Sequence, residues 1–413
     1  MANKDYIFDI TKLRLEGDFN SQVHQILEFI RLTRAEVENL QLLFDHLHDA
    51  LQSVWPGCQV HAFGSIVTGL GIKSSDVDCF IRLPVWLQNP GDTYVAQAKA
   101  ALMQYPRIFT ELFAIKGAKV PIVKFYHVPT QRHCDISFKS PTGVENSKLL
   151  AYLLNLDNRV LPLAILIKYW AKVHKLTGTN LMPNYALTLL IIFYLQHKAI
   201  LPPISLLQRN VEHIVDNWNV AFEDVMHVSG NNESLYELLG GFFKYYRDFK
   251  YDVFLVCPFL GLPIKRDLFA KGGNVPSEFE LYKTNLKRRN CLPLRTNSLI
   301  CIQDPFDHSR NCSVAMYPRL VNKIMSCISQ SAEIYENKKS EIFLWEILSM
   351  AIEESPAVSK KRRVRNGVAK FKPNHNIKKA AQTFHKAFMR YKEKERGKNK
   401  RNLNNFSHNV TKH

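Results

Sequence analysis

Residues 63–82 read FGSIVTGLGIKSSDVDCFIR and combine a Gly-Ser pair with two closely spaced Asp residues. Gly64 and Ser65 follow an apolar run and can bring backbone N–H groups and a hydroxyl close to phosphate oxygens. The DVDCFI segment alternates as a β-strand does, so Asp76 and Asp78 share one face, roughly 7 Å apart along it. The pattern predicts a phosphate-binding turn followed by a strand with two carboxylates.

A third carboxylate, Asp135, stands in HCDISF, within the second of two predicted strands at residues 120–125 and 132–138. Together with Asp76 and Asp78 it can hold two Mg²⁺ or Mn²⁺ ions about 4 Å apart. Alone, a Gly-Ser pair is usually a turn, and an Asp-x-Asp pair is usually a solvated strand edge. Their combination in this order and spacing favours metal-dependent transfer of a nucleotidyl group.

The motifs GSIVTGL, SDVD and HCDISF resemble those of the RNA-specific terminal nucleotidyltransferases of the DNA polymerase β superfamily, which are poly(U) and poly(A) polymerases. The similarity continues through about residue 330. It implies an α+β fold, in which a mixed-sheet nucleotidyltransferase domain and a helical, poly(A) polymerase-associated domain enclose the active site in a cleft. We therefore expect the catalytic domain at residues 52–140, the helical domain at 18–51 and 141–350, and a basic tail at 359–413.

Apolar spacing places the helices of this arrangement. It predicts two helices within Asp18–Leu51 and further helices at Leu149–Leu154, Leu161–His174, Ala186–His197, Leu235–Phe249 and Pro318–Met350.

The resemblance also implies roles for residues after the catalytic unit. Asn146 matches the position that binds the ribose of the nucleotide, although an Asn there could instead cap the following helix. Lys168 and Lys172 share one helix face and match the lysines that neutralise the triphosphate; by composition alone they would be surface charges. Tyr185 matches the aromatic residue that stacks on the base. Asn184 replaces the usual Ser that contacts the triphosphate.

The late loop, DPFDHSRN at residues 304–311, bears on the choice of base. Uridylyl-adding relatives commonly carry His where this chain has Arg310. Arginine only donates hydrogen bonds, and uracil offers the acceptor O4 where adenine offers an amino donor, so UTP is expected over ATP. Asp304 or Asp307 could accept the uracil N3–H. Alternatively, Arg310 faces solvent or RNA phosphate, an Asp accepts the adenine amino group, or His308 reads the base.

Composition bounds the remaining possibilities. The chain has 413 residues, of which 46% are hydrophobic, enough for two domains. Its eight cysteines form no Cys-x-x-Cys pair and no zinc-finger spacing, which fits a reducing compartment without bound zinc. The N-terminus resembles neither a secretory signal nor a transit peptide. The longest apolar run, around Ala186–Leu195, is too short to span a bilayer, so no membrane partner is expected.

Most of the positive charge lies in the tail. Residues 359–413 contain 18 Lys and Arg against two Glu, a net of +16, whereas the whole chain carries 55 − 37 = +18. Such a segment is partly a solvated, disordered extension, but apolar residues at helical spacing suggest a basic helix that could lie on RNA or on the enzyme body. Residues 360–363 also fit a nuclear import signal, which predicts the nucleus, the cytoplasm or both. The expected RNA contacts are Lys360, Lys361, Arg362, Arg363, Lys378, Lys379, Lys386 and Arg390.

The resulting hypothesis is a template-independent RNA 3′-terminal nucleotidyltransferase. The RNA 3′-hydroxyl would attack the α-phosphorus of UTP and release pyrophosphate, with Asp76, Asp78 and Asp135 as catalytic and metal-binding residues. Because the body lacks an appended RNA-recognition module, selection of the target RNA is expected to rest on the tail or on an RNA-targeting protein as a partner. The alternatives are a poly(A) polymerase of the same fold using ATP, a catalytically silent RNA-binding relative, and a small-molecule nucleotidyltransferase.

Overall fold

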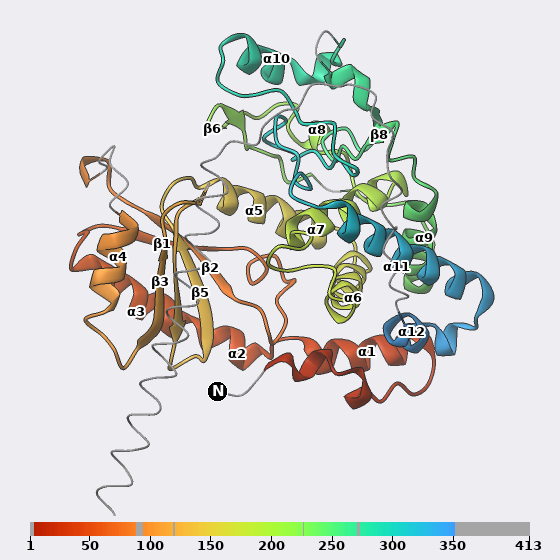
Figure 1. Ribbon diagram of the computed structural model, residues 1–413, viewed down its shortest axis with the longest axis horizontal. Coiled ribbons are helices and arrows are strands. Elements are labelled where there is room, and N and C mark those ends of the chain that lie inside the picture. Colours follow the sequence, from red (N-terminus) through yellow and green to blue (C-terminus); the bar gives the residue numbers. More distant parts are fainter. Residues whose placement is uncertain (1–3, 88–93, 119, 226, 271–272, 352–413) are drawn as a thin grey trace, which may run out of the picture. The chain divides into compact units, whose positions relative to one another are not determined.

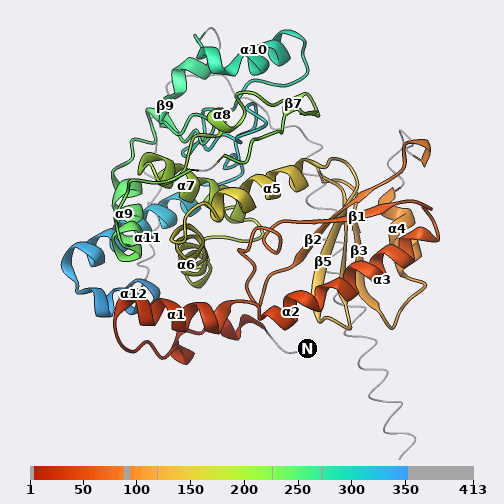
Figure 2. The same ribbon diagram turned by 180° about the vertical axis from the view of Figure 1, so that it is seen from behind.

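A mixed five-stranded sheet carries the Gly-Ser turn and the predicted acidic positions (Figures 1 and 2). The computed structural model describes residues 4–87, 94–118, 120–225, 227–270 and 273–351. The strands are β1 (Gln59–Phe63), β2 (Val77–Arg82), β3 (Phe109–Ile115), β4 (Ile122–His127) and β5 (Arg132–Ser137). In the order β1-β2-β5-β4-β3, β2 and β5 run parallel and the other neighbours antiparallel. The predicted α+β fold with a mixed sheet is confirmed.

One row of paired residues crosses all five strands. From β1 to β3 its members are Phe63, Asp78, Asp135, Lys124 and Phe113. Burial alternates strictly along β4 between half-buried and buried positions, as expected for a strand with one face on a core. The row lies on the less buried face, so two acidic residues and a lysine are side by side outside the core of the sheet.

Two helices cover the other face of the sheet: α3 (Leu40–Gln52) and α4 (Tyr94–Leu102), seen beside the strands in Figure 1. Their buried Leu and Ala residues pack with the buried strand residues into one hydrophobic cluster. This packing supports the strands on one face of the sheet. Asp78 and Asp135 lie on the opposite face, away from the cluster.

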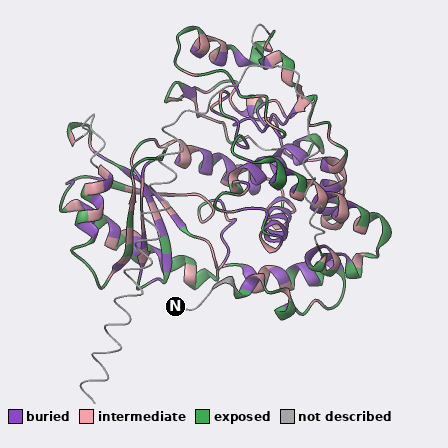
Figure 3. Ribbon diagram, in the orientation of Figure 1, coloured by how far each residue is buried: buried purple, intermediate pink, exposed green. Residues whose placement is uncertain are grey.

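A second, larger hydrophobic cluster joins the helices that follow the sheet to the first long helix of the chain. Its main helices are α1 (Phe19–Ile30), α5 (Thr142–Leu154), α6 (Val160–Val173), α7 (Asn184–His197), α9 (Leu235–Asp248), α11 (Pro318–Asn337) and α12 (Ser340–Ser349). Figure 3 shows α6 buried through most of its length, so it forms the centre of this part. No helix among the described residues is long and apolar enough to cross a membrane.

Short elements complete the described chain. They are α2 (Arg34–Glu38), α8 (Ile204–Leu207), α10 (Glu280–Lys287), the hairpins β6 (Ile214–Val215) with β7 (Trp218–Asn219) and β8 (Phe254–Leu255) with β9 (Ile264–Lys265), and 3₁₀ turns at Lys4–Phe8, Ile10–Lys12, Val85–Leu87, Arg266–Phe269 and Ser277–Phe279.

The helix boundaries differ from the expected ones in three places. The helix expected at Leu149–Leu154 begins at Thr142, as α5. Residues 18–51 form three helices, because Thr33 starts α2 with a capping box in which it and Glu36 exchange hydrogen bonds. The predicted helical stretch Pro318–Met350 is divided between α11 and α12, with extended backbone at Lys338 and Lys339.

Packing also bears on the domain boundaries. The buried residues of α1 join the helical cluster, whereas those of α3 join the cluster of the sheet, although residues 18–51 were expected to belong together. We propose that the catalytic domain begins with α3, and that α1 with residues 142–349 forms the helical domain.

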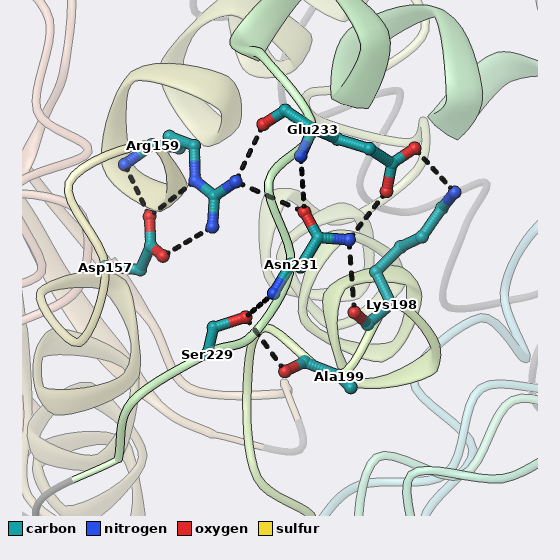
Figure 4. A network of polar contacts seen from close by, with 7 residues as sticks. All are labelled: Asp157, Arg159, Lys198, Ala199, Ser229, Asn231 and Glu233. Carbon is teal, nitrogen blue, oxygen red and sulfur yellow. Dashed lines mark hydrogen bonds and ion pairs between the residues drawn. The ribbon is translucent and has the colours of Figure 1, made fainter.

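A polar network joins three loops of the helical part (Figure 4). Arg159 pairs with Asp157 at 2.7 Å and donates to the Asn231 side chain at 3.2 Å. Asn231 in turn donates to Glu233 at 2.7 Å, and Glu233 pairs with Lys198 at 2.8 Å. The network therefore ties the start of α6 and the end of α7 to the segment that leads into α9.

Candidate active site

The turn after β1 can be formed only with glycine at position 64. Gly64 has φ = 77°, and a Cβ added there would lie 2.3 Å from Oδ2 of Asp78. Its N–H donates to Ser147 Oγ at 2.8 Å, and that hydroxyl donates to the Gly143 carbonyl in the first turn of α5. The absence of a side chain thus lets the turn lie directly against the Asp78 carboxylate.

The three predicted carboxylates come together at the sheet. Asp78 and Asp135 are paired neighbours on β2 and β5, and Asp76 is exposed just before β2. Lys124 on β4 donates to Asp135 Oδ2 at 2.6 Å, and its side chain is 42% exposed. Lys124 was not among the predicted site residues. Its place in the VPIVKF strand, opposite the strand of Asp135, was the signal that could have identified it.

The charges of this group are only partly balanced. Burial, followed by the nearby charges of Asp135 and Asp76, raises the pKa of Asp78 to about 7. Burial also raises the pKa of Asp135, against the opposing hydrogen bond from Lys124. A carboxylate whose pKa is raised by burial and by neighbouring carboxylates suits a divalent cation, which would neutralise it. Among the described residues, no three His, Cys, Asp or Glu side chains form a ready-made metal cluster.

A cavity of about 310 Å³ opens beside Asp78. It brings together eight of the predicted residues: Gly64, Ser65, Asp78, Asn146, Lys168, Asn184, Tyr185 and Arg310. They come from the β1 turn, β2, α5, α6, α7 and the late loop. Thr68, Ser147 and Thr188 also line it and were not predicted, because isolated hydroxyl residues give no pattern in a sequence.

Lys168 is buried in the wall of this cavity. Its Nζ donates to the Leu70 carbonyl at 2.6 Å. Burial, followed by the charge of Lys172, lowers the pKa of Lys168 to about 7, and Asp78 opposes the shift. A buried ammonium with one hydrogen bond retains two N–H donors for an anion. Lys172 lies one turn further along α6 and does not line the cavity.

Asn146 and Tyr185 present polar atoms without partners. Oδ1 of Asn146 is buried and makes no hydrogen bond with any described residue. Because α5 begins at Thr142, Asn146 lies inside the helix, so the alternative that it caps this helix is wrong. The Tyr185 hydroxyl is buried without a hydrogen bond in the described structure, and the Arg310 guanidinium lies 5.7 Å from the centre of its ring.

Arg310 is the residue of the late loop that lines the cavity. The fully buried Asp304 accepts from the backbone N–H of Asp307 at 3.1 Å and pairs with Arg310 at 3.5 Å. Asp307 accepts from Ser309. His308 is buried, with its ring 4.2 Å from that of Phe259. None of Asp304, Asp307 and His308 lines the cavity, whereas Arg310, the partner of Asp304, does.

The predicted RNA-contacting residues of the tail lie outside the described residues. They are Lys360, Lys361, Arg362, Arg363, Lys378, Lys379, Lys386 and Arg390.

Comparisons with known proteins agree with this geometry. A family model described as "Poly(A) RNA polymerase, mitochondrial-like, central palm domain" matches residues 19–155, which include all three carboxylates. The terminal uridylyltransferase cid1 of Schizosaccharomyces pombe is 28% identical over 245 residues, covering 55% of this chain and 58% of that protein. Residues 19–155 therefore match the palm domain of RNA terminal nucleotidyltransferases, the family that the sequence motifs resemble.

Relatives named for different activities, a uridylyltransferase and a poly(A) polymerase, are equally similar to the chain. The speckle targeted PIP5K1A-regulated poly(A) polymerase of Danio rerio is also 28% identical, over 311 residues, covering 61% of this chain and 38% of that protein. The chain thus spans only part of both relatives. A structure of the Cid1 poly(U) polymerase bound to MgATP superimposes with a TM-score of 0.67 at 23% identity, covering 81% of this chain and 99% of that one.

Proposed function

We propose that this protein adds UMP from UTP to the 3′ ends of RNA without a template. The observation that supports this most directly is the cavity beside Asp78, in which the Gly-Ser turn, the buried Lys168 and the partnerless Asn146 amide converge. The Gly-Ser turn and Lys168 suit a triphosphate, Asp78 suits a metal ion, and the Asn146 amide suits a ribose hydroxyl. The family relationship supports RNA as the acceptor.

In the proposed mechanism the chain mainly positions the reactants. Asp76 and Asp78 would hold both of two Mg²⁺ or Mn²⁺ ions, and Asp135 would hold the catalytic one and help to deprotonate the RNA 3′-hydroxyl. The ions, when bound, supply charge neutralisation and a lowered pKa for the attacking hydroxyl. Ser65 and Lys168 would hold the β- and γ-phosphates in line, so catalysis rests on orientation and charge stabilisation.

Several further contacts are proposed for the nucleotide. Asn146 would exchange hydrogen bonds with the ribose 2′-hydroxyl, which favours ribonucleotides. Tyr185 would stack on the base, and Asn184 would contact the triphosphate. Lys172 lies outside the cavity lining, so we propose that it acts at longer range, through its charge.

The preference for UTP rests on Arg310. It lines the cavity, its side chain is 44% exposed, and Asp304 orients it toward the ring of Tyr185. A guanidinium at the edge of a base stacked on Tyr185 donates to uracil O4, whereas the amino group of adenine would leave it without an acceptor. ATP use by the same fold is the second candidate, favoured by the equal identity to a poly(A) polymerase.

The remaining proposals concern partners and location. The basic residues 359–413 would bind RNA through phosphate charge, and an RNA-targeting protein would select the transcript. The KKRR segment at 360–363 supports nuclear entry, and cytoplasmic activity is the alternative. A family description that includes the word mitochondrial adds a third compartment to be tested.

The experiment that tests the function is 3′-extension of a short labelled RNA with each of the four nucleoside triphosphates in turn. A ladder with UTP alone is the expected result. A ladder with ATP instead would keep the enzyme class and overturn the choice of base. RNA binding without any ladder would identify a silent relative, and consumption of triphosphate without RNA would indicate a small-molecule enzyme.

A further inference from the structure

The open face of the sheet continues past the acidic residues. In the row that crosses the sheet, Lys124 follows Asp135 on the side away from the nucleotide cavity. Next to Lys124 along β4 on the same face is Tyr126, which pairs across the strands with His133 of β5. The rings of Tyr126 and His133 lie 5.0 Å apart, Tyr126 is half-buried and His133 is exposed.

The direction of the reaction determines what this face receives. Transfer of a nucleotidyl group is an in-line displacement, so the attacking hydroxyl and the leaving pyrophosphate lie on opposite sides of the α-phosphorus. The cavity that would take the triphosphate includes Asp78 but neither Asp135 nor Lys124. The attacking RNA end must therefore approach from the side of Asp135 and Lys124.

The chemistry of this side matches single-stranded RNA. Base stacking on aromatic side chains and phosphate contacts with lysine are the two components of sequence-tolerant binding to single strands. Lys124 uses one N–H on Asp135 and keeps two donors. Its charge is complementary to a phosphodiester, and the aromatic pair is one residue pair away from it on the same face.

We propose that Lys124, Tyr126 and His133 form the binding site for the 3′-terminal nucleotide of the RNA acceptor. The terminal base stacks on the Tyr126–His133 pair, and Lys124 contacts the last phosphodiester while it holds Asp135. The site is continuous with the catalytic carboxylates, so it delivers the 3′-hydroxyl to them. This inference rests on the proposed function, because it assigns the acceptor side of the same reaction.

Kinetics of His133→Ala and Tyr126→Leu test the site. Each variant is expected to raise the KM for RNA about tenfold, the effect of losing one base–aromatic contact, and to leave the KM for the triphosphate within about twofold. The matched control is Lys99→Gln on α4, whose helix packs against the opposite face of the sheet. An unchanged KM for RNA in both variants would overturn the proposal.

A second experiment separates stacking from indirect damage. RNA whose 3′-terminal nucleotide lacks its base should bind the wild-type protein about tenfold more weakly. It should bind the double variant with Tyr126→Leu and His133→Ala no more weakly than intact RNA does, because both ring contacts are already lost. Equal additional losses in the variant would place the terminal base elsewhere and overturn the inference.

The same comparison, of two RNAs on the wild-type protein and on a variant, applies to Lys124. Replacing the last phosphodiester by an uncharged methylphosphonate should weaken binding to the wild-type protein and have no further effect on Lys124→Gln. Lys124→Arg, which retains the charge, should behave as the wild type does in this comparison. A methylphosphonate effect of equal size in Lys124→Gln would exclude Lys124 as the phosphate contact.

Photocrosslinking distinguishes failure of this inference from failure of the proposed function. RNA with 4-thiouridine at its 3′ end is irradiated with the full-length protein in the absence of triphosphate, and the modified peptide is mapped. Crosslinks within residues 122–137 support the site even when no triphosphate is incorporated, an outcome that would remove only the proposed function. Crosslinks confined to other described segments would overturn the site.

Discussion

The cavity beside Asp78 and the network around Asn231 contain the same kinds of side chain in opposite electrostatic states. In the network, Asp157 is paired with Arg159, whose hydrogen bonds lower the pKa of that carboxyl (Figure 4). In the cavity, burial and neighbouring carboxylates raise the pKa of Asp78 to about 7, and burial lowers that of Lys168 to about 7. The carboxylate and the guanidinium of the network are paired, whereas burial disfavours the charged forms of Asp78 and Lys168 in the cavity.

This difference indicates what each cluster does. A buried polar group with its partners in place stabilises the fold, and one without them costs free energy that a ligand can recover. The network joins three segments of the helical part, so its function is structural. The cavity retains unbalanced charge and a partnerless amide, so its groups are suited to metal, phosphate and ribose. Four substitutions test this difference between the cavity and the network.

Asp78→Asn should separate activity from stability most strongly. Removing a metal-binding carboxylate is expected to lower nucleotidyl transfer by roughly a thousandfold or more. Because the folded protein disfavours the charge of Asp78, the free energy of unfolding without metal should equal or exceed that of the wild type. Extension assays and urea denaturation measure the two quantities. A large loss of stability would mean that Asp78 is a structural residue.

Arg159→Ala should have the opposite profile. It leaves Asp157 without its pair and removes donors to Asn231 and Glu233, which should cost about 3 kcal/mol of unfolding free energy. The turnover of the folded fraction should remain within about twofold of the wild type. Arg247→Ala is the matched control, because its partner Glu336 is more exposed and about 1 kcal/mol is expected. Similar losses in both variants would argue against a special role for the network.

Arg310→Lys should change the choice of base. Lysine preserves a positive charge for Asp304 but lacks the fixed fork of donors, so the ratio of kcat/KM for UTP to that for ATP should fall about tenfold. Competition between the two triphosphates on one RNA measures this ratio. A ratio that stays constant while RNA affinity falls would show that Arg310 contacts RNA phosphate instead.

Asp157→Asn should give the smallest effect and a defined pH dependence. Hydrogen bonds from Arg159 lower the pKa of Asp157 from its ordinary 3.8, so the unfolded chain takes up the proton first as the pH falls. The carboxylate therefore contributes fully above about pH 4 and loses its contribution as the pH falls through the lowered value. We expect the variant to be about 1 kcal/mol less stable at pH 7, with the difference disappearing below pH 4.

Denaturation of both proteins across this pH range is the corresponding measurement. A difference that persists unchanged in acid would mean that shape, and not charge, connects Asp157 to the network.

Local patterns explain how much of the fold could be predicted from the sequence. Alternation and strand composition gave β2, β4 and β5, and apolar spacing gave α6, α7 and α9 close to their observed bounds. The packing of α3 against the sheet could not be predicted, because an amphipathic helix does not encode which surface covers its apolar face. Similarly, the break between α11 and α12 has no Gly or Pro to mark it.

The candidate site likewise contains residues that local patterns predict and residues that only the packing identifies. Asp76, Asp78 and Asp135 could be predicted because they stand in motifs with fixed spacing. The structure pairs Asp78 with Asp135 across β2 and β5 and places Asp76 just before β2. The place of Lys124 beside Asp135 follows only from the strand register. Asn146 was predicted, but only the packing shows that its Oδ1 is buried without a partner among the described residues.

Short-range patterns and the chemistry of single side chains were enough to predict the mixed sheet, the resemblance to terminal nucleotidyltransferases and the three candidate carboxylates. The tertiary structure was needed to show that Asp304 pairs with Arg310 and that Lys168 is buried beside Asp78. It was also needed to show that Lys124, Tyr126 and His133 lie next to Asp135 on one face of the sheet. Charge balance and burial could not be predicted because they depend on neighbours distant in the chain. Those neighbours are set by packing and strand register.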